Sequence, residues 1–456
     1  MLDDTIAAIS TAPGVGGIGI IRISGENAFN IVDKIFEVKD KDFCVKNPVS
    51  GTIKYGHIKE NEKVIDEVLV SFFVKPHSYT TEDVAEINCH GGVVVIRKIL
   101  SLLLENGARL AEPGEFTKRA FINGRIDLTE AEAVIDIISS KSDKARSIAV
   151  TQLNGGLSNK LKEINNVLYD ILIKIEAGID YPEHEIEEVA KSEIKEKINE
   201  TLTGLDRIYS SFDEGKVLKD GVKTVILGKP NVGKSSLMNV LLKENRAIVT
   251  DIPGTTRDLV TETTTVRGIP LLVVDTAGIR ETEDKIEEIG VQKAVNEIDT
   301  ADMIIAVFDL SRALDDEDKN ILKLIENKKS IIIVNKDDLE RKWNAEEELK
   351  GKNVVFVSLK NMTGIEEVED MIENMWKTND LSTSEDVILT TLRHKNLVFD
   401  AINELKAGIE AIDTGMPLDM ISINVKDASL KIGEILGVNV TEDVIKGIFE
   451  RFCLGK

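Results

Sequence analysis

Cysteine, histidine and proline are scarce in this chain of 456 residues, which contains three cysteines, five histidines and nine prolines. The cysteines (Cys44, Cys89 and Cys453) lie far apart and form no C-x-x-C pair, which argues against a disulfide framework and against a thiolate zinc site. The histidines show no metal-ligand spacing either. We therefore expect a protein of a reducing compartment, the cytoplasm.

Long apolar runs and an excess of positive charge are also missing. No apolar stretch is long enough to cross a bilayer, and Met1–Asp4 lack the basic and apolar regions of a signal peptide, so we expect no membrane partner. The 57 basic and 80 acidic residues give a net charge of -23. Because phosphate binding needs clustered Lys and Arg, such a chain is a poor non-specific binder of nucleic acid, and any RNA contact should be local or rely on a partner protein.

The apolar pattern changes along the chain, whose length favours about two or three domains. Residues 1–119 alternate short apolar runs with Gly and Pro, which is typical of an α+β domain. Residues 120–218 and 379–456 have apolar positions at helical spacing. Residues 219–378 contain five near-continuous apolar runs that suit parallel strands buried on both faces: Val225–Leu227, Leu271–Val274, Met303–Phe308, Ser330–Val334 and Val354–Val357. The sequence therefore predicts an all-α helical domain formed by both flanks, with an α/β domain inserted in it.

Two local signals mark helices in the first helical flank. Asp127 and Glu130 have the spacing of a capping box, which opens a helix. A stripe of apolar residues at helical spacing predicts one face of a helix that is buried in the core of a bundle. The stripe consists of Leu161, Ile164, Leu168, Ile171 and Ile175.

A phosphate-binding loop, Gly228-Lys-Pro-Asn-Val-Gly-Lys-Ser235, follows a predicted strand and precedes a helical run. Its glycines let backbone N–H groups surround the phosphates, and Lys234 adds positive charge at the outer phosphates. Ser235 offers its hydroxyl to Mg²⁺. The residues expected at the nucleotide are Gly228, Asn231, Val232, Gly233, Lys234, Ser235 and Ser236.

Two further segments fit the phosphate end of the nucleotide. In Asp275-Thr-Ala-Gly278, Asp275 is placed to hold Mg²⁺ through water, and the Gly278 N–H can meet a γ-phosphate. In Gly254-Thr-Thr-Arg-Asp258, Thr256 is a second Mg²⁺ ligand when the γ-phosphate is present. The residues expected here are Gly254, Thr256, Asp275, Thr276, Ala277 and Gly278.

A guanine-binding motif, Asn335-Lys-Asp-Asp338, ends the fourth strand-like run. The Asp338 carboxylate can accept from N1–H and from the 2-amino group of guanine, a pair of donors that adenine lacks. Asn335 can serve the other edge of the base, and the stem of Lys336 can pack over it. Ser358-Leu359-Lys360 completes the pocket, so the ordered motifs predict GTP and GDP as ligands rather than ATP.

The residue after Gly278 is unusual for a GTPase. Ras-like GTPases have a glutamine there that orients the attacking water, whereas this chain has Ile279, which cannot hold a water. Composition does not choose among the acidic residues that follow, because a run of charge is also typical of a solvated helix surface. No arginine finger is evident, although Arg257 and Arg280 are near. The acidic candidates are Glu281, Glu283, Asp284, Glu287 and Glu288.

Three blocks outside the GTPase motifs are distinctive. One is Asp4-Thr-Ile-Ala-Ala-Ile9 with Pro13-Gly14, Gly17 and Arg22-Ile-Ser-Gly25. Another is Pro113-Gly-Glu-Phe116 with Arg119-Ala-Phe-Ile-Asn-Gly-Arg-Ile-Asp-Leu128, and the last is the C-x-G-K ending at Cys453–Lys456. The GTPase motifs occur in many families, but with these blocks the whole chain resembles the MnmE (TrmE) family of tRNA-modification GTPases.

The resemblance implies partners and a cofactor. It implies a homodimer that acts with the flavoprotein MnmG, as a heterotetramer, to add an aminomethyl or carboxymethylaminomethyl group to C5 of the wobble uridine of certain tRNAs. It also implies a tetrahydrofolate derivative, such as 5-formyl-tetrahydrofolate, in the N-terminal domain. The matching folate residues are Arg22, Glu86, Arg125 and Lys456, and Cys453 matches a cysteine that the family needs for modification. Arginines suit the carboxylates of folate, and Glu86 can accept from pterin N–H groups.

The resemblance also implies K⁺-dependent catalysis. In the family, K⁺ binds where an arginine finger would reach, the two GTPase domains approach each other, and a glutamate that matches Glu287 positions the water. Pro253 stands where some relatives have other residues. The residues implied at K⁺ are Asn231, Thr250, Ile252 and Thr255, and Asp251 and Pro253 lie with them at the nucleotide.

Two other kinds of function remain open from the motifs. A regulatory or ribosome-assembly GTPase would use the nucleotide only as a binding switch, and it would not be expected to carry the N-terminal block or the C-x-G-K ending. A scaffold that binds nucleotide without hydrolysing it has only Ile279 in its favour.

Overall fold

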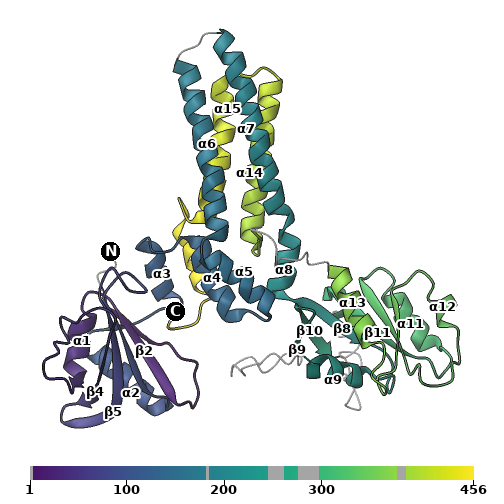
Figure 1. The fold of residues 1–456 in the computed structure, drawn as a ribbon, viewed down its shortest axis with the longest axis horizontal. Helices are drawn as coiled ribbons and strands as arrows, with labels where there is room; N and C mark the ends of the chain where they lie inside the picture. Colours follow the sequence, from purple (N-terminus) through teal and green to yellow (C-terminus); the bar gives the residue numbers. More distant parts are fainter. Residues whose placement is uncertain (1–3, 181–183, 245–260, 276–296, 377–386) are drawn as a thin grey trace. The chain divides into compact units, whose positions relative to one another are not determined.

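The structure is a computed structural model that describes residues 4–180, 184–244, 261–275, 297–376 and 387–456 (Figure 1). The chain forms two compact units, each assembled from separate stretches of sequence. Unit 1 comprises Met1–Ile135, Leu153–Asn165 and Ser429–Lys456, and unit 2 comprises Asp136–Gln152 and Asn166–Ala428. None of the described helices combines the length and the apolar composition that a membrane-spanning helix requires.

Unit 1 contains a seven-stranded sheet with the order β3-β4-β5-β6-β2-β1-β7. Neighbouring strands run antiparallel, apart from β1 and β7, which run parallel. The strands are β1 (Ile6–Ile9), β2 (Ile18–Ser24), β3 (Phe36–Val38), β4 (Thr52–Glu60), β5 (Lys63–Phe73), β6 (Val84–His90) and β7 (Arg109–Leu110). Helices α1 (Ala28–Ile35) and α2 (Val93–Glu105) cover one face of the sheet, and α3 (Glu115–Ile122) follows β7.

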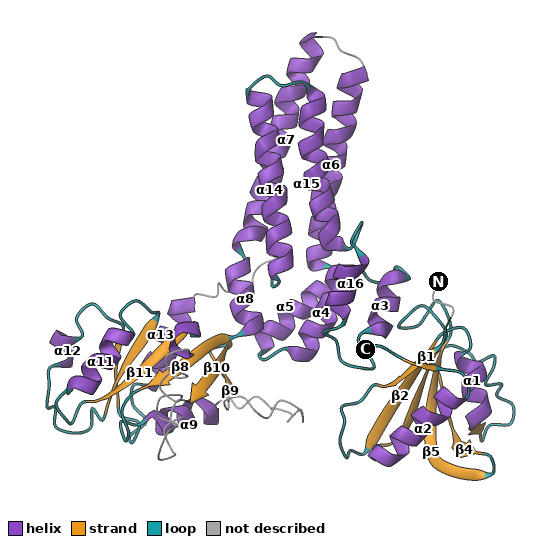
Figure 2. Cartoon of the chain, turned by 180° about the vertical axis from the view of Figure 1, so that it is seen from behind, coloured by secondary structure: helices purple, strands orange, loops and turns teal. Residues whose placement is uncertain are grey.

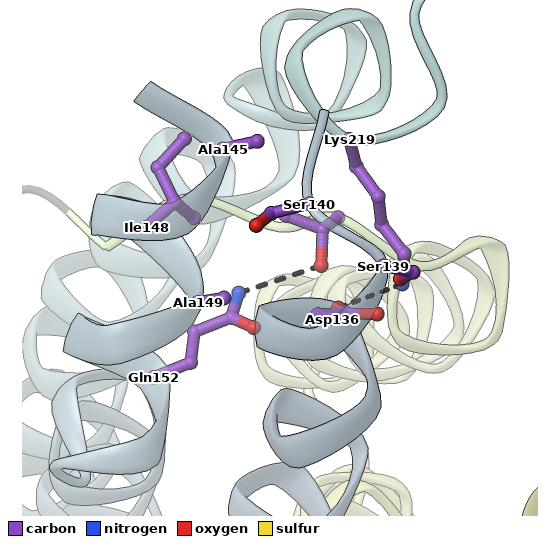
Figure 3. Close-up of a pocket in the computed structure, with 9 residues that line it drawn as sticks. Asp136, Ser139, Ser140, Ala145, Ile148, Ala149, Gln152 and Lys219 are labelled. Carbon is purple, nitrogen blue, oxygen red and sulfur yellow. Dashed lines mark hydrogen bonds and ion pairs between the residues drawn. The ribbon is translucent and has the colours of Figure 1, made fainter. Parts of the chain in front are cut away.

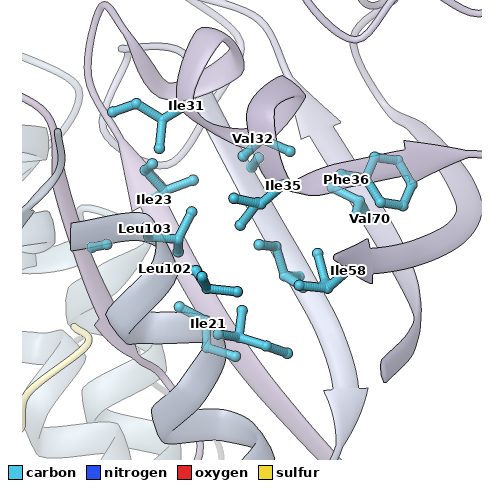
Figure 4. Packing of buried hydrophobic residues seen from close by; sticks show 14 of the residues in the cluster. Ile21, Ile23, Ile31, Val32, Ile35, Phe36, Ile58, Val70, Leu102 and Leu103 are labelled. Atoms are coloured by element: carbon cyan, nitrogen blue, oxygen red, sulfur yellow. The ribbon is translucent and has the colours of Figure 1, made fainter. Parts of the chain in front are cut away.

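The core of this unit decides which side chains of the sheet stay accessible. Ile21 and Ile23 of β2 point towards Val32 and Ile35 of α1 and towards helix α2 (Figure 4). Burial of each isoleucine side chain contributes roughly 1.5–3 kcal/mol to the free energy of unfolding. Because side chains alternate along a strand, Arg22 must lie on the opposite face of the sheet from these isoleucines.

The helices that follow confirm the helical part of the predicted fold. The capping box forms: Asp127 Oδ1 accepts from the Glu130 N–H (3.1 Å), and Glu130 Oε2 accepts from the Asp127 N–H (2.9 Å). All five residues of the predicted apolar stripe on α6 are buried. Helices α7 and α14 pack side by side although most of unit 2 separates them in sequence (Figures 1 and 2). The helices are α4 (Leu128–Ser139), α5 (Asp143–Leu153), α6 (Gly156–Asp180), α7 (His184–Ser210), α8 (Phe212–Asp220), α14 (Leu392–Asp413), α15 (Leu418–Leu436) and α16 (Glu442–Phe449).

Unit 2 also contains a six-stranded sheet with the order β13-β12-β11-β8-β10-β9. All neighbours are parallel except β9 and β10, which form an antiparallel pair. The strands are β8 (Val222–Leu227), β9 (Thr261–Val266), β10 (Ile269–Asp275), β11 (Met303–Asp309), β12 (Ser330–Asn335) and β13 (Val354–Val357). The described helices of this part are α9 (Lys234–Glu244), α11 (Asp316–Leu324), α12 (Ala345–Glu348) and α13 (Ile365–Trp376).

The two faces of this sheet have separate apolar clusters, and every residue of β11 is buried. This arrangement explains why its strands read as continuous apolar runs and confirms the predicted α/β fold. The edge strand β9 was not predicted, since five of its residues are Thr or Glu and only Val266 is apolar. One of these threonines, Thr264, is buried and donates its hydroxyl to the Leu241 carbonyl oxygen (2.8 Å).

Candidate functional site

The phosphate-binding loop joins the end of β8 at Leu227 to the start of α9 at Lys234. Gly228 and Gly233 have φ values of 150° and 112°, and Asn231 has a φ of 64°, so three positions of the loop adopt positive φ. A Cβ atom on Gly228 would lie 2.5 Å from the Val307 carbonyl oxygen. Lys234 Nζ donates to the carbonyl oxygens of Gly228 (2.9 Å) and Lys229 (2.8 Å). These contacts hold the ammonium group within the curve of the loop.

The guanine-binding motif is connected to the phosphate loop through Asn335, a buried residue at the end of β12. Its Nδ2 donates to the Val232 carbonyl oxygen (2.7 Å), and its Oδ1 accepts from the Leu359 N–H (3.2 Å). The Ser358 hydroxyl donates to Asp338 Oδ1 (2.7 Å). The three predicted parts of the site therefore meet at the carboxyl ends of parallel strands, where open α/β sheets bind their ligands.

Lys336 has a partner that lies outside the guanine-binding motif. Its Nζ donates to Asp309 Oδ2 (2.6 Å), and Asp309 is the last residue of β11. The available signal was an aspartate that closes the otherwise apolar run Met303–Phe308. Lys360, the last predicted residue of the base pocket, follows Leu359 in the loop after β13.

Several predicted residues of the phosphate and cation sites lie outside the described residues. Ser235 and Ser236 lie in the first turn of α9, and Asp275 is the last residue of β10, directly before one of the segments that are not described. Within the described ranges, no group of three or more His, Cys, Asp or Glu residues is arranged to hold a metal ion. The predicted residues outside the described ranges are Thr250, Asp251, Ile252, Pro253, Gly254, Thr255, Thr256, Thr276, Ala277, Gly278 and Glu287.

A second cluster lies in unit 1, where the register of β2 and β6 places Arg22 directly opposite Glu86. Arg22 Nε and Nη2 lie 2.8 and 2.7 Å from Glu86 Oε1, and Arg22 Nη1 donates to the Gly455 carbonyl oxygen (3.4 Å). The side chains of Arg22 and Glu86 are 12% and 23% exposed. The pair is thus largely shielded from water, yet it lies on the sheet face that the helices leave open.

Tyr79 brings a second arginine to this cluster. The guanidinium carbons of Arg22 and Arg125 lie 4.9 and 4.7 Å from the centre of the Tyr79 ring. The Tyr79 hydroxyl forms a hydrogen bond of 2.9 Å with Thr117 Oγ1, which fixes the ring. One aromatic ring thereby attracts two guanidinium groups through cation–π contacts. Tyr79 could not be predicted from the sequence, because a single aromatic residue in a polar loop carries no recognisable pattern.

The segment Cys453–Lys456 reaches the same cluster. The Phe116 N–H donates to the Lys456 carbonyl oxygen (3.2 Å), and the Ser10 hydroxyl donates to the Gly455 carbonyl oxygen (3.1 Å). Burial lowers the pKa of the Lys456 ammonium group, and the nearby charge of Arg22 lowers it further. The structure therefore brings together Arg22, Glu86, Arg125 and Lys456, while the Cys453 side chain is exposed.

A small cavity in unit 2 is not a candidate site. It leaves about 10 Å³ open to the centre of a water molecule, which is roughly the space of one water. Its polar lining is already paired: Asp136 forms an ion pair of 2.8 Å with Lys219 (Figure 3), and the Gln152 amide donates to the Ile388 carbonyl oxygen (2.8 Å). The cavity can hold a structural water but no larger ligand.

Comparison with known proteins covers almost the whole chain. A family model described as the MnmE helical domain matches residues 128–453, and one described as the GTP-binding protein TrmE N-terminus matches residues 5–125. The tRNA modification GTPase MnmE of Acetivibrio thermocellus is 51% identical over 459 residues, which cover 100% of this chain and 99% of that protein. The proteins of the same name from Alkaliphilus oremlandii and Clostridioides difficile are 47% and 46% identical, and the matches cover 100% of each chain.

The largely parallel sheet, the phosphate loop after β8 and the guanine motif at the end of β12 define a P-loop GTPase, a hydrolase acting on GTP. The family models and the full-length relatives then identify the group within that class. The chain belongs to the MnmE (TrmE) family.

Proposed function

We propose that this chain is a tRNA-modification GTPase of the cytoplasm, whose GTP hydrolysis drives the addition of an aminomethyl or carboxymethylaminomethyl group to C5 of the wobble uridine. The observation that carries the proposal is the presence, in one chain, of a guanine site and of the Arg22–Glu86 cluster in unit 1. Relatives that match over their full length are named tRNA modification GTPases. A homodimer and a flavoprotein partner of the MnmG type belong to the same proposal.

At the nucleotide, the described residues have separate tasks. The backbone of the phosphate loop and Lys234 bind the phosphates, and the Ser235 hydroxyl is a ligand for Mg²⁺. Asp338 reads the Watson–Crick edge of guanine, with its orientation set by Ser358. Mg²⁺ and K⁺ would neutralise charge that builds up on the phosphates. Thr256, and Asp275 through water, complete the proposed Mg²⁺ site, and Glu287 positions the attacking water. The proposed K⁺ site consists of Asn231, Thr250, Ile252 and Thr255.

The cluster in unit 1 suits a tetrahydrofolate derivative. Arg22 and Arg125 provide two guanidinium groups for carboxylates, and the Glu86 carboxylate can accept from N–H groups of a pterin. Because Arg22 and Glu86 are paired across adjacent strands, we propose that both face the bound ligand. Lys456 adds a further cation at the same place.

A regulatory or ribosome-assembly GTPase is the alternative function. Such a protein needs the phosphate loop and the guanine motif, but it has no use for the cluster at Arg22 and Glu86. The match of residues 5–125 to the TrmE N-terminus therefore favours tRNA modification.

The decisive experiment measures the modified nucleosides of tRNA from cells that lack this protein. We expect the aminomethyl and carboxymethylaminomethyl derivatives of the wobble uridine to disappear and to return when the wild-type gene is supplied. A Lys234→Ala variant, which cannot bind the outer phosphates, should not restore them. An unchanged nucleoside profile in the deletion strain, together with a defect in ribosome assembly, would support the alternative function.

A further inference from the structure

We propose that Asp309 is a positioning residue for guanine, which acts by holding the ammonium group of Lys336 so that the stem of this lysine has one fixed place beside the base. The inference rests on the GTP binding that is part of the proposed function. It adds to the guanine motif a residue that lies outside its four positions and on a different strand.

The carboxylate of Asp309 has one orientation. Oδ2 accepts from Lys336 Nζ (2.6 Å), and Oδ1 accepts from the N–H (2.9 Å) and the hydroxyl (2.6 Å) of Ser311. The main-chain oxygen of Asp309 accepts from Trp343 Nε1 (3.1 Å). Because both ends of the residue are held and its side chain is only 7% exposed, the carboxylate is a rigid anchor.

Lys336 needs such an anchor. In the same motif, Asn335 is held by its hydrogen bond to Val232, and Asp338 by the one from Ser358. A lysine side chain, by contrast, has four rotatable carbon bonds and many conformations. Lys336 also has a φ of 68°, so its backbone takes the left-handed conformation and the chain leaves the extended path of β12 at this residue. The contact with Asp309 selects one of the conformations that the stem could otherwise adopt.

The charge state of the pair supports a role in preorganisation. Burial by itself would raise the pKa of the Asp309 carboxyl, but hydrogen bonds from Lys336 and Ser311 outweigh this effect and hold the pKa below its usual value. The carboxylate is therefore ionised at neutral pH, and the ion pair is present before a nucleotide binds. Less conformational freedom of Lys336 is then lost on binding, which increases affinity.

A double-mutant cycle on the full-length protein tests whether Asp309 acts through Lys336. We expect Asp309→Asn and Lys336→Met each to weaken GTP binding about tenfold in calorimetric titrations. The double variant should bind GTP less than about twofold more weakly than Lys336→Met alone, because the ammonium group that Asp309 holds is already absent. The ratio of affinities for GTP and ITP should stay unchanged in Asp309→Asn, since Asp338 reads the 2-amino group.

Asp302→Asn is the matched control, because Asp302 directly precedes β11 at its other end and accepts from the Lys223 N–H (2.9 Å). It should bind GTP like the wild type. If Asp309→Asn does not fold, as judged by circular dichroism, Ser311→Ala removes only the hydroxyl that orients the carboxylate, and it should weaken binding about two- to threefold.

The outcomes separate this inference from the proposed function. Failure of the wild-type protein to bind GTP would overturn the proposed function itself. Normal GTP binding by Asp309→Asn, or tenfold losses that multiply in the double variant, would overturn only the positioning role. If Ser311→Ala is the variant tested, normal GTP binding overturns the same role.

Discussion

The Asn335 amide donates a hydrogen bond of 2.7 Å to the main-chain oxygen of Val232, which connects the guanine-binding motif directly to the phosphate loop. The two segments come from strands that are separated by β11 in the sheet. Gly233 follows Val232, and a Cβ atom at this position would overlap with the Asn335 amide. The close approach of the two motifs therefore requires a glycine here, as does the φ of 112°.

We expect Gly233→Ala to lower GTP affinity by at least about 100-fold, because the new methyl group pushes Asn335 away from the loop and strains the backbone. Calorimetric titration with GTP measures the effect. Gly351→Ala is the control: Gly351 also has a positive φ, of 83°, but a Cβ there would have no atom within 4 Å. That variant should lose about 1 kcal/mol of stability and bind GTP normally. Equal GTP affinities for the two variants would contradict the role of the Asn335 contact.

GTP hydrolysis should be at least about tenfold faster in K⁺ than in Na⁺ at equal ionic strength. Asn231, which has a φ of 64° within the phosphate loop, is the described residue of the proposed K⁺ site. We expect Asn231→Ala to remove most of the difference between the two salts, as measured by phosphate release. Asn353 directly precedes β13 and lies outside the phosphate loop. Asn353→Ala should therefore keep the difference in hydrolysis rate between the two salts. The same turnover in both salts for the wild type would rule out the cation mechanism.

Glu287→Ala should abolish hydrolysis while GTP affinity stays within about twofold of the wild type, because a group that positions water contributes mainly to the transition state. Single-turnover hydrolysis and equilibrium binding, measured on the same preparation, separate the two effects. Alanine variants of Glu281, Glu283, Asp284 and Glu288 are the controls. Full activity of Glu287→Ala would shift the role to one of those four residues.

Titration of the full-length protein with 5-formyl-tetrahydrofolate should show binding that Arg22→Ala weakens at least about tenfold, since this change removes a cation and leaves the Glu86 carboxylate unpaired. Lys59→Ala is the matched control, because Lys59 forms a comparable ion pair (2.7 Å) with Glu37 elsewhere in the same sheet. Absence of folate binding by the wild-type protein would remove the folate proposal without affecting the GTPase.

Acid should loosen the contact between the phosphate loop and α11. The side-chain hydrogen bond from Lys229 lowers the pKa of Asp315 from 3.8 to about 2. Because the folded-state pKa lies below the unfolded value, the pair stabilises fully above about pH 4, and this contribution is lost as the pH falls towards 2. Asp315→Asn keeps the helix cap but removes the charge.

Hydrogen–deuterium exchange of the α11 amides between about pH 2 and 5 measures this effect, after correction for the intrinsic exchange rates. The wild type should lose protection steeply towards pH 2, and Asp315→Asn should have a shallower pH dependence. Asp316→Asn removes one charge from the same turn and keeps the pair with Lys229, so it should behave like the wild type. Identical pH profiles for all three proteins would show that the pair does not stabilise this region.

Much of the fold could be predicted because its signals are local. The five apolar runs between Val225 and Val357 became β8 and β10 to β13, and the capping box at Asp127 opens α4. The strand β9 could not be predicted, since its residues acquire strand character only by pairing with β10 at the edge of the sheet. The bounds proposed for the domains remain a prediction, and the two compact units divide the chain differently, because segments distant in sequence pack together.

The sequence by itself determined the class of nucleotide, since the phosphate loop and the guanine motif each consist of neighbouring residues whose chemistry does not depend on distant parts of the chain. Only the tertiary structure decided which side chains support them. Asp309 meets Lys336 because β11 and β12 run in parallel and in register, with Asp309 opposite Asn335. Arg22 meets Glu86 because β2 and β6 are neighbours, and Tyr79 joins them from the loop before β6. Strand order and register bring together residues that are far apart in sequence, and no local pattern records these contacts.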